Sequence, residues 1–246
     1  YAHSDMVVVD MGINADMSGV PDLLDRKIAF GTKNIAEGPA MTRAEAIRSI
    51  ETGIEIAEEK AKEGYKVFTI GEMGISNTTS SACILGAFNQ WNALEVTGRG
   101  TNISDERLRH KVEVVQKAMD VNHPDPADGL DVLSKVGGFE YGCMTGVILG
   151  AAANRALTII DGFNTTASAF IAKALCPEAV QYLMASHLSL EQAHKKSLAA
   201  LGLTEYIDLD FRLGEAIGAG IQTRMLDYAL SVYRECVTKE EAGVKA

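Results

Sequence analysis

The sequence predicts an α/β protein built on a parallel sheet, because short apolar runs alternate with segments of helical periodicity. Three β-branched runs, at residues 6–9, 67–70 and 157–160, are apolar throughout, which is typical of strands buried on both faces. An aromatic content of 6%, with abundant alanine, valine, isoleucine and leucine, favours helices on a sheet over a β-sandwich. Each run ends beside an acid and a glycine, and helical patterns follow the second and third runs.

The helices are predicted from capping residues and from apolar side chains at helical spacing. Thr42 and Glu45 fit a capping box, and the helix that follows should end at Gly64. Its predicted apolar face comprises Ala44, Ile47, Ile50, Ile54, Ala57 and Ala61. Further helices are predicted from Ser104 toward Met119 and over residues 139–153, 165–175 and 190–201. The last long helix follows Gly214, and its apolar stripe suits either a core or a subunit interface.

Composition narrows the class of protein. A chain of 246 residues, 47% of them hydrophobic, can bury one core, so a single domain over residues 1–246 is expected. A net charge of −10 without a basic patch argues against nucleic-acid binding. No apolar stretch reaches membrane-spanning length, so no membrane partner is expected. The 4 cysteines lack C-x-x-C spacing, which predicts buried thiols and a cytoplasmic protein.

The segment from Gly71 to Ser81, GEMGISNTTSS, follows a predicted strand and opens a predicted helix. Its glycines permit close approach of a ligand, and the helix N-terminus offers N–H donors to an anion such as phosphate. Asn, Thr and Ser are also ordinary capping residues, so a structural role fits the same pattern. Glu72 is repelled by an anion, and we therefore expect it to face ribose hydroxyls or a leaving heterocycle.

The segment from Asp210 to Gly220, DFRLGEAIGAG, places Glu215 among apolar and glycine neighbours at a helix start. Burial there would raise the pKa of Glu215 toward a range useful for accepting a proton, whereas the helix N-terminus would lower it. A carboxylate that simply stabilises the first helical turn is the competing interpretation.

Basic residues near Gly98-Arg99-Gly100 form a third candidate, with Lys111 downstream and Arg107 and Arg109 alongside. They suit a phosphate clamp, and equally a solvated helix face. The five histidines share no spacing, so no metal site is expected, and no Ser/His/Asp nucleophile motif is present.

Taken in chain order, these segments resemble the nicotinate-nucleotide–dimethylbenzimidazole phosphoribosyltransferase family of cobalamin nucleotide-loop assembly. The resemblance spans nearly the whole chain. Its matching stretches are VVVDMGINAD (7–16), GTKNIAEGPAMTRAEA (31–46), GEMGISNTTSSA (71–82), VTGRGTNISDERLRHK (96–111), HPDPADGLDVLSKVGGFE (123–140), IIDGFNTTASA (159–169), MASHLS (184–189) and LDFRLGEAIGA (209–219).

The resemblance implies a Rossmann-like parallel sheet with flanking helices and a smaller helical subdomain, which we expect over about residues 177–237. It also implies a homodimer that needs no cofactor or metal. Members of the family exchange the nicotinate of nicotinate mononucleotide for dimethylbenzimidazole or a similar base, giving α-ribazole 5′-phosphate with inversion at the anomeric carbon. Glu215 then matches the general base. The implied substrate-binding residues are Glu72, Gly74, Asn77, Thr78, Lys111, Gly162, Thr165 and Leu213.

The sequence departs from the family pattern at a few places. Ser76 replaces a glycine, and residues 215–219 read EAIGA where the family has EGTGA. The family also carries a segment before Val7 that helps build the base pocket, and we expect its absence from this sequence to affect base selection and activity. Two alternatives remain at this point. One is a non-catalytic or half-active subunit of a hetero-oligomeric paralogue, and the other is a generic nucleotide-binding Rossmann protein.

Overall fold

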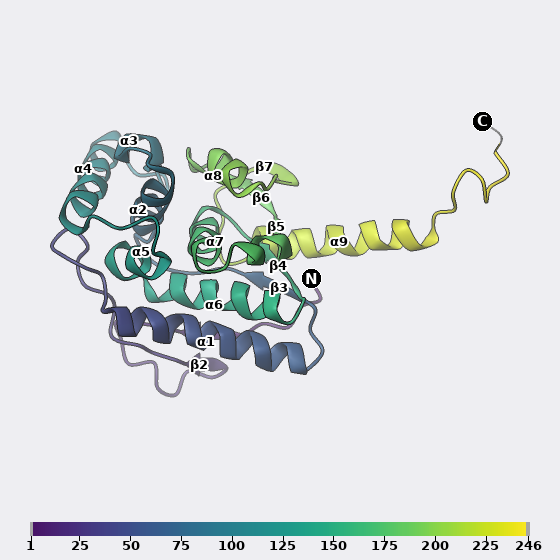
Figure 1. The fold of residues 1–246 in the computed structure, drawn as a ribbon, viewed down its shortest axis with the longest axis horizontal. Coiled ribbons are helices and arrows are strands. Elements are labelled where there is room, and N and C mark those ends of the chain that lie inside the picture. The colour runs from purple at the N-terminus through teal and green to yellow at the C-terminus, as the bar shows by residue number, and fades with distance from the viewer. Residues whose placement is uncertain (1, 245–246) are drawn as a thin grey trace.

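A three-stranded parallel sheet in the order β3-β4-β5 forms the centre of the fold in a computed structural model that describes residues 2–244 (Figure 1). The strands are β3 (Val67–Ile70), β4 (Leu157–Ile160) and β5 (Leu183–Ala185), with Val67 opposite Leu157 and Thr158 opposite Leu183. The α/β prediction with a parallel sheet is therefore confirmed, as are the bounds of its second and third strands. The carboxyl ends of these strands lie at one edge of the sheet, where ligands bind in open α/β folds.

Two parallel two-stranded ribbons flank this sheet. The first pairs β1 (Val8–Asp10) with β2 (Leu23–Asp25), and the second pairs β6 (His187–Ser189) with β7 (Ile207–Phe211). The prediction of a buried strand at residues 6–9 was wrong in its burial. Met6 is 83% exposed and Val8 is 46% exposed, because β1 lies in a separate ribbon and not inside the central sheet.

Helices α1 (Arg43–Lys62) and α6 (Phe139–Ala153) lie side by side across the lower part of Figure 1. The capping box predicted at Thr42 is present, and the predicted bounds of α6 are confirmed. The predicted apolar face of α1 was partly wrong, since Ala44 and Ile47 are exposed while Ala46, Ser49 and Gly53 are buried. A methyl group at Gly53 would overlap the carbonyl of Cys143, so close backbone contact with α6 decides which face is buried.

Within the described residues, six further helices and one 3-10 helix complete the body of the molecule. They are α2 (Thr78–Asn89), α3 (Ala93–Val96), α4 (Asp105–Asn122), α5 (Gly129–Val136), α7 (Phe163–Leu175), the 3-10 helix η1 (Pro177–Tyr182) and α8 (His194–Leu201). Ser104 caps α4 as predicted. Helix α8 begins four residues later than predicted, because residues 190–193 form a turn that buries Glu191 against the chain near Gly98.

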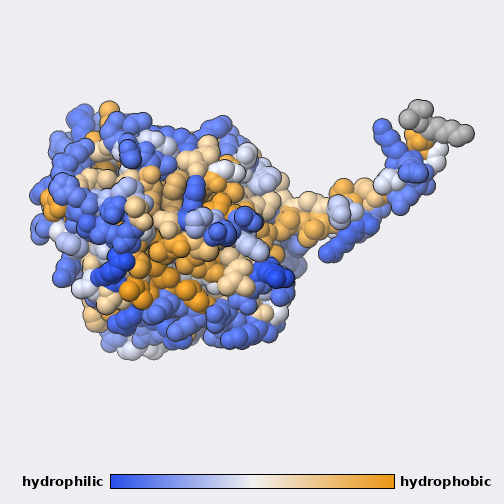
Figure 2. Space-filling view, in the orientation of Figure 1, coloured by the Kyte–Doolittle hydropathy of each residue, from blue (hydrophilic) through white to orange (hydrophobic). Residues whose placement is uncertain are grey.

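Helix α9 (Ile217–Glu235) projects from the body of the molecule, and Figure 2 shows apolar and polar surface on opposite sides of it. Its buried residues are confined to Gly218, Ala219 and Gln222 near its start. Ile221, Met225 and other members of the apolar stripe are exposed, so the stripe is not core within this chain. The segment 177–237, expected to form a smaller helical subdomain, contains β5, β6 and β7 besides its helices, and the subdomain stays a prediction.

The cysteines are free, and their burial differs from the prediction. Cys83 and Cys143 are buried, but Cys176 is half-buried and Cys236, just after α9, is exposed. Within residues 2–244, no helix is long and apolar enough to cross a membrane.

Candidate functional site

The loop between β3 and α2 holds the carboxylate of Glu72 in a network of side-chain amides. Asn77, the N-cap residue of α2, donates through Nδ2 to Glu72 Oε2. Asn164, at the start of α7, donates through Nδ2 to Glu72 Oε1 at 2.8 Å and to Asn77 Oδ1 at 2.9 Å. Ser81 donates to Asn164 Oδ1 at 2.6 Å, which fixes the orientation of that amide. The orientation of Glu72 is thus set by the protein alone.

A second carboxyl group, that of Glu140 at the start of α6, lies beside Glu72. Asn77 Nδ2 is 3.5 Å from Glu140 Oε1, so one amide stands between the two acids. Burial raises the pKa of Glu140 to about 7, and the negative charge of Glu72 adds to this rise. Tyr141 donates to the backbone carbonyl of Asn77 at 2.8 Å and so fixes the backbone from which this amide extends. Glu140 therefore adds a negative charge to this pair near neutral pH.

The turn that carries Glu215 packs directly against the start of the Glu72 loop. A methyl group at Gly71 would overlap the amide nitrogen of Ala216, and one at Gly214 would lie 3.7 Å from Glu72 Oε1. Glu215 and Ala216 both adopt left-handed backbone conformations, with φ of 62° and 61°. For residues other than glycine this costs about 1–2 kcal/mol each, so the surrounding structure must enforce the turn. The two sequence motifs are therefore neighbours in space.

The surroundings of Glu215 differ from the prediction in two respects. The side chain is exposed in the single chain and does not lie in an apolar pocket, because no element of residues 2–244 covers this turn. Glu215 also precedes the first turn of α9 and does not lie within it. Leu213, predicted to bind substrate, is 51% exposed on the same loop, and Met73 beside Glu72 is 74% exposed. These side chains give the exposed face an apolar character.

The sequence suggested Glu215 as a carboxylate that stabilises the first turn of the last helix. In the structure, Asp161, the residue that follows β4, takes this role at the start of α9. Its Oδ1 accepts a hydrogen bond from the amide of Ala219 at 2.9 Å. Burial raises the pKa of Asp161 to about 6, although the amides of Ala219, Gly218 and Ala216 oppose that rise. The start of α9 is therefore held by a carboxylate from a distant strand and not by a residue of its own first turn.

Lys111 lies at the other end of the Glu72 loop. Its ammonium donates to Thr78 Oγ1 at 2.8 Å and to the carbonyl of Gly98 at 3.1 Å. Burial lowers the pKa of Lys111, while the nearby carboxylate of Glu191 opposes that effect. The amide of Gly100 donates to Glu191 Oε1 at 2.6 Å. Lysine, threonine hydroxyl and helix N-terminus together provide donors suited to an oxyanion.

The other basic residues of this segment do not join Lys111. Arg99 bonds to the side chain of Asp105 and to the carbonyl of Ile103, at 2.9 Å for the latter. Arg107 and Arg109 are exposed on α4. Of the predicted basic cluster, Lys111 is thus the residue that contacts Thr78. The two arginines of α4 lie on a solvent-exposed face of that helix.

Three further predicted residues shape the backbone of the site. Gly74 packs against Asn77, since a methyl group there would lie 2.7 Å from Asn77 Nδ2. Gly162 is the N-cap residue of α7 and has no capping side chain. Thr165 is buried and donates to the carbonyl of Gly162 at 2.9 Å, so its hydroxyl is used inside the helix. The Thr165 hydroxyl is therefore not free to donate to a ligand in this structure.

Several residues of the network were not singled out from the sequence. Asn164 and Glu140 lie within stretches that match the family, in IIDGFNTTASA and at the end of HPDPADGLDVLSKVGGFE. Their position in those stretches was a usable signal. Glu191 lies in a less distinctive segment, and its contact with Gly100 could not be foreseen from local pattern.

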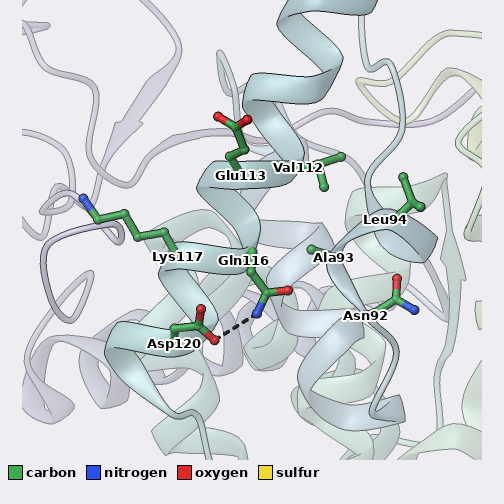
Figure 3. Close-up of a pocket in the computed structure, with 8 residues that line it drawn as sticks. All are labelled: Asn92, Ala93, Leu94, Val112, Glu113, Gln116, Lys117 and Asp120. Carbon is green, nitrogen blue, oxygen red and sulfur yellow. Dashed lines mark hydrogen bonds between the residues drawn. The ribbon is translucent and has the colours of Figure 1, made fainter.

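Two grooves on the surface lie apart from these residues. A groove of about 490 Å³ runs between α3 and α4, lined by Leu94, Val112 and six neighbours, with Gln116 bonded to Asp120 at 2.9 Å (Figure 3). A second, of about 580 Å³, lies near the start of α1 and includes Arg43. Neither contains a predicted site residue. The candidate site lies at the strand ends, on a face where Met73 and Leu213 are exposed. Across residues 2–244, no group of three or more His, Cys, Asp or Glu side chains is placed to hold a metal ion.

Comparison with known proteins gives a consistent result. A family model described as phosphoribosyltransferase matches residues 1–244. Relatives from Clostridioides difficile and Syntrophotalea carbinolica, each named nicotinate-nucleotide–dimethylbenzimidazole phosphoribosyltransferase, are 47% and 49% identical over 98% and 99% of this chain and 69% of each relative. A crystal structure of CobT from Thermus thermophilus superposes with a TM-score of 0.91 at 38% identity, covering 97% of this chain and 71% of that one.

The raised pKa of Glu140 predicts that stability falls as the pH rises. In the unfolded chain this group ionises near its usual pKa of 4.5, but in the folded protein only near about 7. The folded state therefore binds more protons between these values, and the free energy of unfolding decreases from about pH 5 to about pH 7. Glu140→Gln should remove about 2–3 kcal/mol of that decrease.

Urea denaturation of the parent and of Glu140→Gln at both pH values measures this difference. Glu51→Gln, at an exposed position of α1, is the matched control and should keep the pH dependence of the parent. The same pH dependence in the parent and in Glu140→Gln would show that Glu140 ionises normally in the folded protein.

Proposed function

The chain belongs to the nicotinate-nucleotide–dimethylbenzimidazole phosphoribosyltransferase family, and on this premise we propose that it transfers the 5-phosphoribosyl group of nicotinate mononucleotide to dimethylbenzimidazole or a similar base. The products are α-ribazole 5′-phosphate and nicotinate. The observation that carries the proposal for this site is the contact between the Glu72 loop and the Glu215 turn, which makes two acidic segments that lie far apart in the sequence neighbours in space.

The phosphate of the mononucleotide is assigned to the end of the site that contains Lys111. The ammonium of Lys111 and the hydroxyl of Thr78 are bonded to each other at 2.8 Å and can both turn to an incoming oxyanion. The N-terminus of α2 lies beside them, and its N-cap residue Asn77 makes no side-chain capping bond, so amide donors remain for the ligand. A phosphate here places the ribose toward Glu72.

The ribose is assigned to the Glu72–Glu140 pair. As the glycosidic C–N bond of the nucleotide breaks, its electron pair passes to the pyridinium nitrogen. Nicotinate leaves with an uncharged ring nitrogen. Positive charge develops on the ribose carbon, and the fixed carboxylate of Glu72 stabilises it. Because Glu72 is already held by Asn77 and Asn164, little reorganisation accompanies the step.

The incoming base is assigned to the exposed face near Leu213 and Met73. One azole nitrogen attacks the ribose carbon from the side opposite nicotinate, forming the new C–N bond. The proton on the other azole nitrogen passes to Glu215, the general base. Burial of Glu215 by the base and by a partner subunit would exclude water from this proton transfer.

We also infer that the protein forms a homodimer through α9. Ile221, Met225, Tyr228 and Val232 are exposed on this projecting helix, with exposures from 39% to 66%. Exposed apolar surface of this kind is typical of a subunit interface. The interface begins one turn after Glu215, so a second copy would also cover the exposed side of the site.

Replacement of the general base should stop the reaction but not nucleotide binding. Glu215→Gln keeps the size of the side chain and cannot accept the azole proton, so turnover should fall by about 10²–10⁴-fold. Incubation with nicotinate mononucleotide and a panel of benzimidazoles, purines and phenols, with mass detection of ribosylated products, measures it. Glu235→Gln, at the exposed end of α9, should react like the parent. Product formation by Glu215→Gln at the parental rate would remove Glu215 from this role, and an inactive parent would refute the proposed function.

Loss of the lysine should weaken nucleotide binding. Lys111→Ala removes a charge-assisted hydrogen bond, and the dissociation constant for nicotinate mononucleotide should rise about 10- to 100-fold. Titration calorimetry measures the change, with Lys117→Ala on the exposed side of α4 as control. An unchanged affinity for Lys111→Ala would place the phosphate elsewhere.

A charge on the apolar face of α9 should separate the subunits. Met225→Glu places a carboxylate on the proposed interface, and light scattering after gel filtration should show monomers where the parent shows dimers. Arg234→Gln changes the net charge by the same amount away from this face and should stay dimeric. A monomeric parent, or a dimeric Met225→Glu, contradicts the interface.

A further inference from the structure

His187, the first residue of β6, lies completely buried behind the turn that carries Glu215. Its Nδ1 is 3.3 Å from the hydroxyl of Ser186 and 3.7 Å from Asp161 Oδ1. Ser186 gives its own proton to the carbonyl of Asp161 at 2.7 Å, so the hydroxyl oxygen can accept from His187. Nδ1 therefore carries the imidazole proton and directs it toward Ser186 and Asp161. Among residues 2–244, His187 Nε2 has no hydrogen-bond partner.

The imidazole of His187 also fills the space between the starts of two helices. A methyl group at Gly218 of α9 would overlap Nδ1, and one at Gly162 of α7 would lie 3.3 Å from Nε2. Both glycines are buried. The ring therefore touches the backbone of α9 on one side and of α7 on the other, and it cannot shift without moving one of them.

The same imidazole supports the carboxylate that caps α9. Asp161 accepts from the amide of Ala219 at 2.9 Å, and the left-handed residues Glu215 and Ala216 immediately precede this capped turn. If the Asp161 carboxylate were free to rotate, it would lose its hydrogen bonds with these amides. The imidazole of His187 lies beside this carboxylate, with Nδ1 3.7 Å from the same Oδ1 that accepts from Ala219.

We infer that His187 is a positioning residue for Glu215, acting through Asp161 and through the backbone of Gly218. The inference rests on the proposed function for its catalytic readout, because Glu215 is the general base of that reaction. His187 itself is too deeply buried to touch either substrate. Its loss should therefore reduce the rate of proton transfer while binding of the nucleotide at Lys111 is preserved.

Two side-chain amides separate the role of Nδ1 from that of ring bulk. Asn at position 187 places an N–H donor where Nδ1 lies, whereas Gln places its donor where Nε2 lies. We expect His187→Gln to lower kcat at least tenfold with KM for nicotinate mononucleotide within twofold of the parent. His187→Asn should retain kcat within about threefold. Equal loss in both variants, or a rise in KM that accounts for the effect, would overturn the inference.

A pair of glycines on α9 tests the backbone contact independently of the imidazole. Gly218→Ala forces a methyl group against His187, whereas Gly220→Ala meets only ordinary contact, 3.6 Å from Ala2. Both changes replace a glycine by alanine near the start of α9, so a tenfold difference between them reports the contact with His187. Gly218→Ala should lower kcat at least tenfold, and Gly220→Ala should match the parent. Equal activities would contradict the inference.

Hydrogen exchange gives a readout that does not depend on the reaction. In His187→Gln, the amides of residues 216–219 should exchange at least tenfold faster than in His187→Asn, because Asp161 no longer holds them. If His187→Gln shows this faster exchange but the parent forms no ribosylated product, the proposed function is refuted and the positioning role of His187 is still supported. Unchanged exchange in a folded His187→Gln would refute the positioning role whatever the activity.

Discussion

The close approach of two backbones, at Gly71 and at Ala216, is the constraint on which the site depends. A side chain at Gly71 would occupy the position of the Ala216 amide, so the loop after β3 and the turn before α9 can meet only because this residue is glycine. The contact brings Glu72 and Glu215 to one face although their segments lie far apart in sequence. Asp161 then anchors the far side of the turn through Ala219, and the unfavourable left-handed conformations are held from both sides.

The amide network around Glu72 explains how an open face can hold a defined geometry. Asn77 and Asn164 each bind the carboxylate, and each is bound in turn by a neighbour, so no rotation of Glu72 is free of cost. Glu140 adds a second acid whose charge depends on pH in the neutral range. A developing positive charge on the ribose favours ionisation of that second acid, so the pair supplies most negative charge when the reaction demands it.

Much of the fold followed from local pattern, whereas the details of the site did not. Continuous apolar runs located β3 and β4 to the residue, and small residues located α6, because these signals need no distant partner. The buried face of α1 was misjudged, since Gly53 allows a close approach that hydrophobicity does not encode. Glu215 was expected at the start of the last helix, but it precedes α9 and its side chain is exposed. That exposure depends on how distant parts of the chain pack around the turn, which the eleven residues of this segment do not encode.

Asp10, Glu72 and Asp161 each lie near a glycine at the end of a strand, but the structure gives each of them a different set of hydrogen-bond partners. Asp10 is buried and bound by Lys27 at 2.6 Å and by the amides of Gly12 and Ile13, so its charge is consumed in stabilising its own turn. Asp161 is buried without a lysine, and the amides of α9 take that place. Glu72 is bound by neutral side-chain amides, which orient its carboxylate without neutralising its charge. Of the three, Glu72 is therefore the one that is neither paired with a lysine nor buried, and its partners and exposure, not its sequence pattern, leave it accessible to a ligand.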